Sequence, residues 1–129
     1  MGTTVLLLVE DDGSLQGLLS VELTEAGFEI VAVGDGTRAL AELNADATRF
    51  CAIITDIKLG RGPDGWDLGH RARELVPDMP VIYMTGDSTH EWSSKGVPNS
   101  VVIAKPFAPA QLVTAVSMLI NDAGAHRTS

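Results

Sequence analysis

The stretch Ile53-Ile54-Thr55-Asp56-Ile57-Lys58 decides the fold of this chain, because its apolar run ends abruptly at a carboxylate. Gly60, Gly62 and Pro63 follow within a few residues and break the regular backbone. This pattern indicates a buried strand with Asp56 at its C-terminal end. In an open α/β sheet, ligands bind at the carboxyl ends of the strands, which makes Asp56 the first candidate for a functional residue.

Three further apolar runs end in polar residues in the same way. They are residues 5–9 before Glu10-Asp11-Asp12, residues 81–84 before Thr85-Gly86-Asp87, and residues 101–104 before Lys105-Pro106. With the runs at 28–33 and 51–55, they predict five short strands. Runs without polar alternation are typical of strands covered on both faces, and strands that alternate with helices form parallel sheets. We therefore expect an α/β fold with a doubly wound five-stranded parallel sheet and helices on both faces.

The segments between these strands carry apolar residues at helical spacing, and several have residues that start or stop a helix. Either Asp12 or Ser14 can cap the first helix, and Gly27 is placed to follow its end. Asp64 can cap the third helix, which Pro77 is expected to end.

The last two helices are expected to differ strongly. Residues 87–95 predict only a weak fourth helix, because Ser, Thr, His and Glu dominate it. The fifth helix is expected to begin near Pro109, and its apolar stripe ends at Ile120. We expect one domain at residues 1–122, followed by a polar tail at 123–129 that frays.

Composition limits the classes of function. The chain has 129 residues, a formal net charge of −8 and a single cysteine, Cys51. One cysteine cannot form an internal disulfide, and an acidic protein does not favour nucleic acid as a direct partner. No apolar run is long enough to span a bilayer, and the N-terminus does not resemble a signal peptide. These features predict a cytoplasmic protein without membrane contact.

The residue types at the strand ends suit phosphoryl transfer to a carboxylate. The nucleophile must be an ionised carboxylate, here Asp56, held in line with the phosphorus atom. The transferred group spreads charge over three oxygens, which Mg²⁺ and nearby donors can neutralise. Glu10 and Asp11 offer further carboxylates to a hard cation. Lys105 and Thr85 can contact the phosphoryl oxygens, so these four strand ends predict one metal-dependent, phosphoryl-accepting site.

Each of these residues also has an ordinary structural explanation. Glu10 and Asp11 could form a solvated turn, and Asp56 could cap one. Thr85 could be a simple strand-end residue, and Lys105 a surface charge. Considered singly, the structural explanation is favoured for each of them. Their joint placement at the ends of predicted neighbouring strands favours the functional site.

The chain resembles the response-regulator receiver domain, the CheY-like family of two-component signalling, over residues 5–120. The resemblance depends on five fragments in order: Leu8-Val9-Glu10-Asp11-Asp12, Ile54-Thr55-Asp56, Asp64-Gly65, Met84-Thr85-Gly86 and Lys105-Pro106-Phe107. It implies a flavodoxin-like sheet with the strand order 2-1-3-4-5. It also implies a phosphoacceptor signalling protein rather than an enzyme.

The same resemblance implies a role for each site residue. Asp56 would be phosphorylated from the phosphohistidine of a histidine kinase. Asp11, Asp56 and the backbone carbonyl of Lys58 would bind Mg²⁺, with Glu10 acting through water. Thr85 and Lys105 would bind the phosphoryl group, and the Lys105–Pro106 bond would be cis.

Four features depart from the usual family pattern. Val102 stands where the family usually has an aromatic switch residue on the fifth strand. The loop at residues 60–63 is rich in glycine, one residue longer than usual and expected to be mobile. In the polar fourth helix, Trp92 either folds over the local surface or anchors a partner. Lys58 and Asp87 stand at positions that influence hydrolysis of the aspartyl phosphate, and they can pair across the mouth of the site.

The resemblance implies a histidine kinase or a phosphotransfer protein as the donor, and a downstream protein that binds the fourth helix, fifth strand and fifth helix. A homodimer that forms through this face is also compatible with the resemblance. The simplest expectation is a stand-alone receiver, and the alternative is a receiver excised from a hybrid histidine kinase.

Three other functions are less favoured. An aspartyl-nucleophile phosphatase would need a second aspartate where Lys58 stands. A nucleotide- or flavin-binding module would need a glycine-rich loop after the first strand. A degenerate receiver that is never phosphorylated would not need the complete set Glu10, Asp11, Asp56, Thr85 and Lys105.

Overall fold

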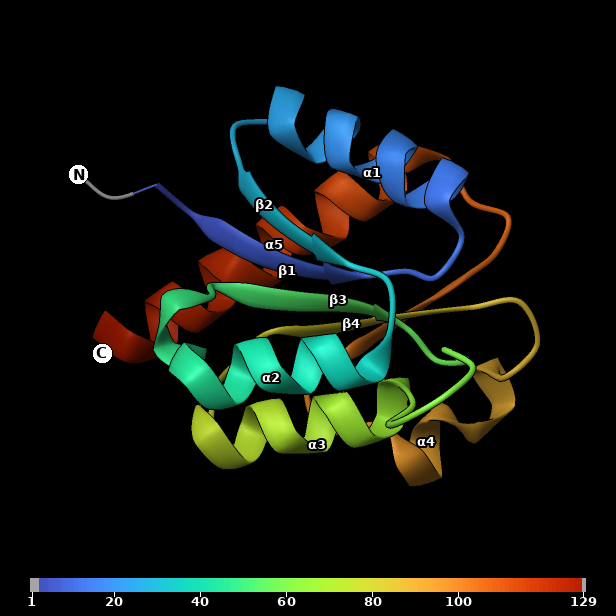
Figure 1. The fold of residues 1–129 in the computed structure, drawn as a ribbon. Helices are drawn as coiled ribbons and strands as arrows, with labels where there is room; N and C mark the ends of the chain where they lie inside the picture. Colours follow the sequence, from blue (N-terminus) through green and yellow to red (C-terminus); the bar gives the residue numbers. More distant parts are fainter. Residues whose placement is uncertain (1–2, 129) are drawn as a thin grey trace.

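The computed structural model describes the backbone of residues 3–128 and the side chains of residues 3–123, and it forms a three-layer α/β sandwich (Figure 1). The strands are β1 (Val5–Val9), β2 (Glu29–Val33), β3 (Ala52–Asp56), β4 (Val81–Thr85) and β5 (Val101–Ala104). The helices are α1 (Gly13–Glu25), α2 (Gly36–Asp46), α3 (Gly65–Leu75), α4 (Trp92–Lys95) and α5 (Pro109–Thr128), with short 3-10 turns at Ala47–Arg49 and Thr89–Glu91.

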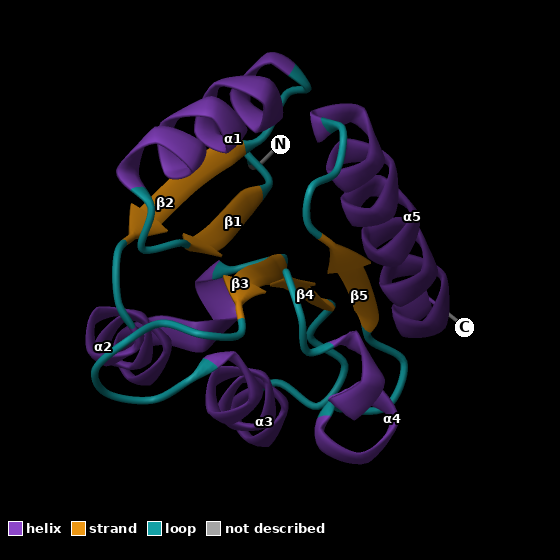
Figure 2. Ribbon diagram, turned by 90° about the vertical axis from the view of Figure 1, so that its right-hand side faces the viewer, coloured by secondary structure: helices purple, strands orange, loops and turns teal. Residues whose placement is uncertain are grey.

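All neighbouring strands are parallel, and their order is β2-β1-β3-β4-β5. Helices α1 and α5 cover one face of the sheet, and α2, α3 and α4 lie on the other (Figure 2). The fold class and the strand order predicted from the sequence are therefore confirmed.

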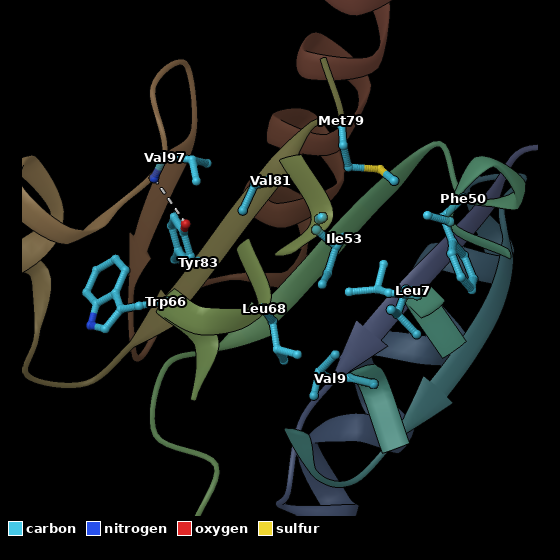
Figure 3. Close-up of a cluster of buried hydrophobic side chains, with 14 of the residues drawn as sticks. Leu7, Val9, Phe50, Ile53, Trp66, Leu68, Met79, Val81, Tyr83 and Val97 are labelled. Atoms are coloured by element: carbon cyan, nitrogen blue, oxygen red, sulfur yellow. Dashed lines mark hydrogen bonds between the residues drawn. The ribbon is translucent and has the colours of Figure 1, made fainter. Parts of the chain in front are cut away.

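The apolar strands divide their side chains between two hydrophobic clusters, one on each face. In β1, Leu7 and Val9 belong to the cluster under α2 and α3, whereas Leu6 and Leu8 belong to the cluster under α1 and α5. This alternation follows from the two-residue period of a strand. All five residues of β1 are buried, as expected for a strand with a helix layer on each side. Figure 3 shows part of the cluster under α2 and α3.

Aspartates cap three of the helices, as their short acceptor side chains favour. Asp12 accepts a hydrogen bond from the Leu15 N–H at 3.1 Å. Asp64 accepts from the Asp67 N–H at 2.9 Å, and Asp67 accepts in return from the Asp64 N–H at 3.1 Å. Asp35 caps α2 in the same manner. The predicted caps of the first and third helices are thus confirmed, and Asp12 rather than Ser14 is the first.

The fifth helix is longer than the sequence pattern predicted. Its apolar stripe ends near Ile120, but the helix continues to Thr128 through much of the segment expected to fray. Residues 121–128 contain no proline, so no residue type there interrupts the backbone hydrogen-bond ladder. The division into a domain at residues 1–122 and a tail at 123–129 stays a prediction.

The fourth helix is as weak as expected. Residues 87–95 form a 3-10 turn at Thr89–Glu91 and a single α-helical turn at Trp92–Lys95. Ser and Thr side chains compete for backbone hydrogen bonds, which disfavours a longer helix here.

The glycine-rich loop after β3 packs against the start of α2. Gly60 and Gly62 have φ values of 73° and 83°, which favour glycine. A Cβ atom on Gly62 would lie 2.5 Å from the Thr37 hydroxyl oxygen, and one on Gly36 would overlap the Pro63 carbonyl. The loop therefore has a defined seat on α2, and its expected mobility stays a prediction.

Candidate functional site at the strand ends

The functional residues predicted from sequence lie at the carboxyl ends of neighbouring strands. Glu10 follows β1, Asp56 ends β3, Thr85 ends β4 and Lys105 follows β5. Backbone bonds extend the sheet to this edge: the Glu10 N–H donates to the Val33 carbonyl at 3.1 Å, and the Lys105 N–H donates to the Thr85 carbonyl at 2.7 Å. The Lys105–Pro106 bond is cis, as the resemblance implied.

Three carboxylates meet at this edge. One oxygen from each of Glu10, Asp11 and Asp56 lies within 4.8 Å of the other two. Among the side chains described, no other group of three or more His, Cys, Asp or Glu residues is close enough to hold a metal ion. Glu10 and Asp56 are 1% and 8% exposed, whereas Asp11 is exposed. Clustered oxygen donors at a partly open edge fit a hard divalent cation that keeps several water ligands.

The Lys105 ammonium connects two of these carboxylates. It donates to Glu10 Oε1 at 2.8 Å and to Asp56 Oδ2 at 3.1 Å. Burial lowers the pKa of Lys105, but the hydrogen bonds to Glu10 and Asp56 outweigh burial and hold the pKa above its ordinary value. For Glu10 the balance is reversed: burial outweighs the bonds from Lys105 and Asp12 and raises its pKa to about 7. The site therefore holds a charged ammonium beside a carboxyl group that titrates near neutrality.

Glu10 is held by both its side chain and its backbone. Its Oε2 accepts from the Asp12 N–H at 3.1 Å. The Gln16 side-chain amide, from α1, donates to the Glu10 carbonyl at 3.0 Å and to the Val33 carbonyl at 3.1 Å. The sequence reasoning missed Gln16. The sequence feature that could have pointed to Gln16 is its place directly after Leu15, beside the apolar stripe of the first helix.

Thr85 is at the predicted strand end, but its hydroxyl faces the following loop. It is 2% exposed, and its oxygen accepts from the N–H groups of Asp87 at 3.2 Å and Ser88 at 2.9 Å. Among the described contacts, none joins this hydroxyl to the carboxylate cluster. Its role toward a phosphoryl group stays a prediction.

Lys58 and Asp87 form the predicted pair. Their ammonium and carboxylate groups lie 2.7 Å apart, with side chains 70% and 65% exposed. The hydrogen bond raises the pKa of Lys58 and lowers the pKa of Asp87. Asp87 also accepts from the Ser88 hydroxyl at 3.1 Å. The role of the Lys58 backbone carbonyl as a metal ligand stays a prediction.

An aromatic residue of the neighbouring strand stands beside Val102. Val102 is half-buried and pairs in register with Tyr83 of β4. Tyr83 is fully buried, and its hydroxyl accepts from the Val97 N–H at 3.2 Å (Figure 3). The Trp66 ring lies 4.7 Å from the Tyr83 ring, centroid to centroid. The sequence reasoning missed Tyr83, although it is the chain's single tyrosine and directly precedes Met84-Thr85.

Trp92 folds over the local surface, one of its two expected arrangements. Its indole N–H donates to the Ser100 hydroxyl at 2.9 Å, and the residue is 37% exposed. The indole also lies close to Gly96, where a Cβ atom would be 2.5 Å from the ring. The exposed part of the ring is thus held in a fixed orientation.

None of the helices described combines the length and the apolar character needed to cross a lipid bilayer.

Comparison with known proteins agrees with this geometry. The response regulator receiver domain model matches residues 6–117. A response regulator receiver protein from Sinorhizobium medicae WSM419 is 40% identical, with a TM-score of 0.90, over 94% of this chain and 97% of that one. The receiver domain of the sensor histidine kinase PA1611 from Pseudomonas aeruginosa PAO1, solved with magnesium in its active-site cleft, is 24% identical. Its TM-score is 0.79, with coverage of 93% of this chain and 99% of that one, so it shares the fold.

Curated relatives differ in how much of their length they share with this chain. The response regulator receiver protein Anae109_2439 from Anaeromyxobacter is 36% identical over 90% of this chain, but the match spans 45% of its own length. The transcriptional regulatory protein DctD from Rhizobium meliloti is 34% identical over 82% of this chain and 23% of itself. CpdR from Brucella abortus is 28% identical over 89% of this chain and 95% of itself. Such domains are generally signalling modules without enzymatic activity of their own, and this chain belongs to the response regulator receiver domain family.

Proposed function

We propose that this chain is a phosphoacceptor of a two-component system, in which Asp56 takes a phosphoryl group from the phosphohistidine of a histidine kinase or phosphotransfer protein. The observation that carries the proposal is the Lys105 ammonium within 3.1 Å of both Glu10 and Asp56, inside the only cluster of three carboxylates among the described side chains. A lone capping aspartate would not need this arrangement.

The reaction itself asks little covalent chemistry of the chain. An oxygen of Asp56 attacks the phosphorus atom, a P–O bond forms as the P–N bond breaks, and the departing imidazole takes up a proton. Lys105 then exchanges its bond to Asp56 for a phosphoryl oxygen, which retains its charge pairing. Thr85 supplies a hydroxyl to a second oxygen once its hydroxyl turns from the 87–88 loop. Positioning and charge neutralisation dominate such transfers.

Mg²⁺ is the cofactor that suits these donors. The residues proposed to hold it are Asp11, Asp56 and the Lys58 carbonyl directly, and Glu10 through water. All are hard oxygen donors, and the carboxylate oxygens are already close together. Bound Mg²⁺ would neutralise charge on the carboxylates and the phosphoryl group. The PA1611 receiver, which has the same fold, holds a magnesium ion in its active-site cleft.

The proposed output surface consists of α4, β5 and α5. Two of the large hydrophobic residues that remain exposed lie there, Trp92 at 37% and Met118 at 61%. A groove of about 620 Å³ runs between Val101 of β5 and the Gln111–Leu119 side of α5. We propose that a downstream protein occupies this face when Asp56 is phosphorylated. A second copy of the chain is the competing occupant. Sedimentation of the phosphorylated protein without any partner would reveal this dimer through a doubled mass.

The expected cytoplasmic location stays a prediction.

The proposal is tested with Asp56→Asn, incubated with acetyl phosphate and Mg²⁺. Wild-type protein should gain the mass of one phosphoryl group, in a form that hydroxylamine removes, and Asp56→Asn should gain none. Asp12→Asn is the matched control, since asparagine caps a helix as well as aspartate does. It should label like wild type. Labelling that persists in Asp56→Asn would show that another residue is the acceptor. A panel of purified histidine kinases then identifies the donor.

A further inference from the structure

The Gln16 side chain links α1 to the ends of two strands. Its amide nitrogen donates to the Glu10 carbonyl at 3.0 Å and to the Val33 carbonyl at 3.1 Å. Both protons of the amide group are therefore used, one on the residue after β1 and one on the last residue of β2. Both partners are carbonyl oxygens, which only accept, so the NH₂ group of the Gln16 amide and not its oxygen faces them.

The location of these bonds gives Gln16 its leverage. At Glu10 the chain leaves the sheet, and its N–H already donates to the Val33 carbonyl at 3.1 Å. Gln16 binds the carbonyl of the same residue, in the next peptide link, so Glu10 is fixed at both its N–H and its carbonyl. Glu10 is 1% exposed, and a buried carbonyl that lost its donor would have little access to water.

The next peptide carries Asp11, the second carboxylate of the cluster. The Glu10 carbonyl and the Asp11 N–H belong to one rigid peptide plane. A rotation of this plane would therefore change the position of the Asp11 backbone and of its carboxylate. Gln16 thereby sets the placement of two of the three clustered carboxylates without contacting either carboxylate group.

We propose that Gln16 is a positioning residue for the cation at the carboxylate cluster, an inference that rests on the proposed function. Residues behind metal ligands typically change metal affinity about 10-fold to 100-fold when they are substituted. The Gln16→Leu variant, which keeps the bulk and removes the donor, should weaken Mg²⁺ binding about tenfold.

The test measures Mg²⁺ dissociation constants by calorimetry without any phosphodonor. Asn44→Leu is the matched control: it also replaces a carboxamide with leucine and also removes a hydrogen bond, the one that Asn44 accepts from Arg71 at 3.0 Å. It should bind Mg²⁺ like wild type. The metal-free proteins provide a second readout, because Gln16→Leu should increase amide hydrogen exchange at Glu10 and shift the Asp11 amide resonance.

A split in the kinetics separates positioning from general damage. With acetyl phosphate, Gln16→Leu should need about tenfold more Mg²⁺ for half-maximal labelling but approach the wild-type rate at saturation. Gln16→Met serves the same test if the leucine variant does not fold. The inference is overturned if either folded variant binds Mg²⁺ as tightly as wild type, or if Asn44→Leu weakens binding equally. If wild-type protein binds no Mg²⁺, the metal part of the proposed function fails instead.

Discussion

Two regions of the molecule are stabilised in different ways: the strand-end site, which contains Glu10, Asp11, Asp56 and Lys105, and the α4 segment, which comprises residues 87–99. The site is made of charged groups that bind one another, with Lys105 between Glu10 and Asp56. The α4 segment has a single helical turn, Trp92–Lys95, and depends on side chains from elsewhere. Tyr83 of β4 accepts from the Val97 N–H, and the His70 ring of α3 bonds the Lys95 carbonyl at 2.8 Å.

Arg73 adds to this external support. From α3, its guanidinium donates to the Pro98 carbonyl at 2.5 Å and to the Met79 carbonyl at 2.6 Å. The comparison shows that ion pairs join the carboxylates of the site to one another through Lys105, whereas hydrogen bonds between backbone groups and side chains of β4 and α3 add to the local bonds of the α4 segment. Substitutions in the site should therefore change stability through charge and pH, and substitutions that affect the α4 segment through packing and hydrogen bonds to backbone groups. The following experiments test that difference.

The largest effect is expected from Lys105→Met in the strand-end site. Loss of the ammonium leaves the Glu10 and Asp56 carboxylates without their shared partner, and breaking such a pair costs about 3 kcal/mol when it is buried. The loss should be largest above pH 7 and smaller at pH 5, where Glu10 is protonated, because its pKa is about 7. Urea unfolding at several pH values measures it. Equal losses at both pH values would contradict this account.

The pH dependence of wild-type stability provides a control, because the raised pKa of Glu10 fixes its direction. Because burial raises the Glu10 pKa from 4.5 to about 7, the folded state holds a proton that the unfolded state releases. The contribution of Glu10 to the free energy of unfolding is therefore greatest below pH 4.5 and falls as the pH rises to 7. Glu10→Gln should flatten this part of the pH profile.

Among the residues that support the α4 segment from outside, Gly69 of α3 should give the next largest effect when it is replaced by alanine. A Cβ atom there would overlap the Tyr83 hydroxyl, and Tyr83 is fully buried. Overpacking of this kind costs about 1–3 kcal/mol, against which alanine's better helix propensity returns about 1 kcal/mol. We expect a net loss of up to about 2 kcal/mol in urea unfolding. Gly17→Ala, on an open face of α1, should instead stabilise the protein.

Tyr83→Phe should cost about 1 kcal/mol, because it leaves the buried Val97 N–H without its acceptor. The same change should partly rescue Gly69→Ala, since it removes the atom that the new methyl group would meet first. A double-mutant cycle measures this coupling. If the two losses of stability were additive, the methyl group introduced at position 69 would act on something other than the Tyr83 hydroxyl.

The smallest effect is expected from Lys58→Met at the mouth of the site. The Lys58–Asp87 pair is exposed, and such pairs add little to stability in the presence of salt. We expect an unchanged Tm but a faster decay of the aspartyl phosphate, because the pair screens the site from water. Decay followed by mass spectrometry, with Arg61→Met as the exposed control, measures this. Equal decay in wild type and Lys58→Met would exclude a screening role.

The two regions also differ in what could be predicted from sequence. The placement of the candidate site residues was largely predictable, because an apolar run that ends in a carboxylate or lysine specifies both a strand and the polar residue at its carboxyl end. Asp12 and Asp64 were predictable as caps for a similar local reason. Gln16 and Tyr83 were not, since their roles depend on carbonyl or N–H groups that are near them only in the folded chain. The length of α5 was missed because polar residues can continue a helix that needs no apolar stripe.

The contact between Gly36 and the Pro63 carbonyl has a consequence for engineering. The loop that follows Asp56 is seated on a position that no side chain can occupy, so its conformation is shared between two segments distant in sequence. Grafting residues 60–63 into another receiver without a glycine at the equivalent of Gly36 would force the loop away from its seat. The smallest transplantable unit is therefore a pair of segments, the loop and the first turn of α2.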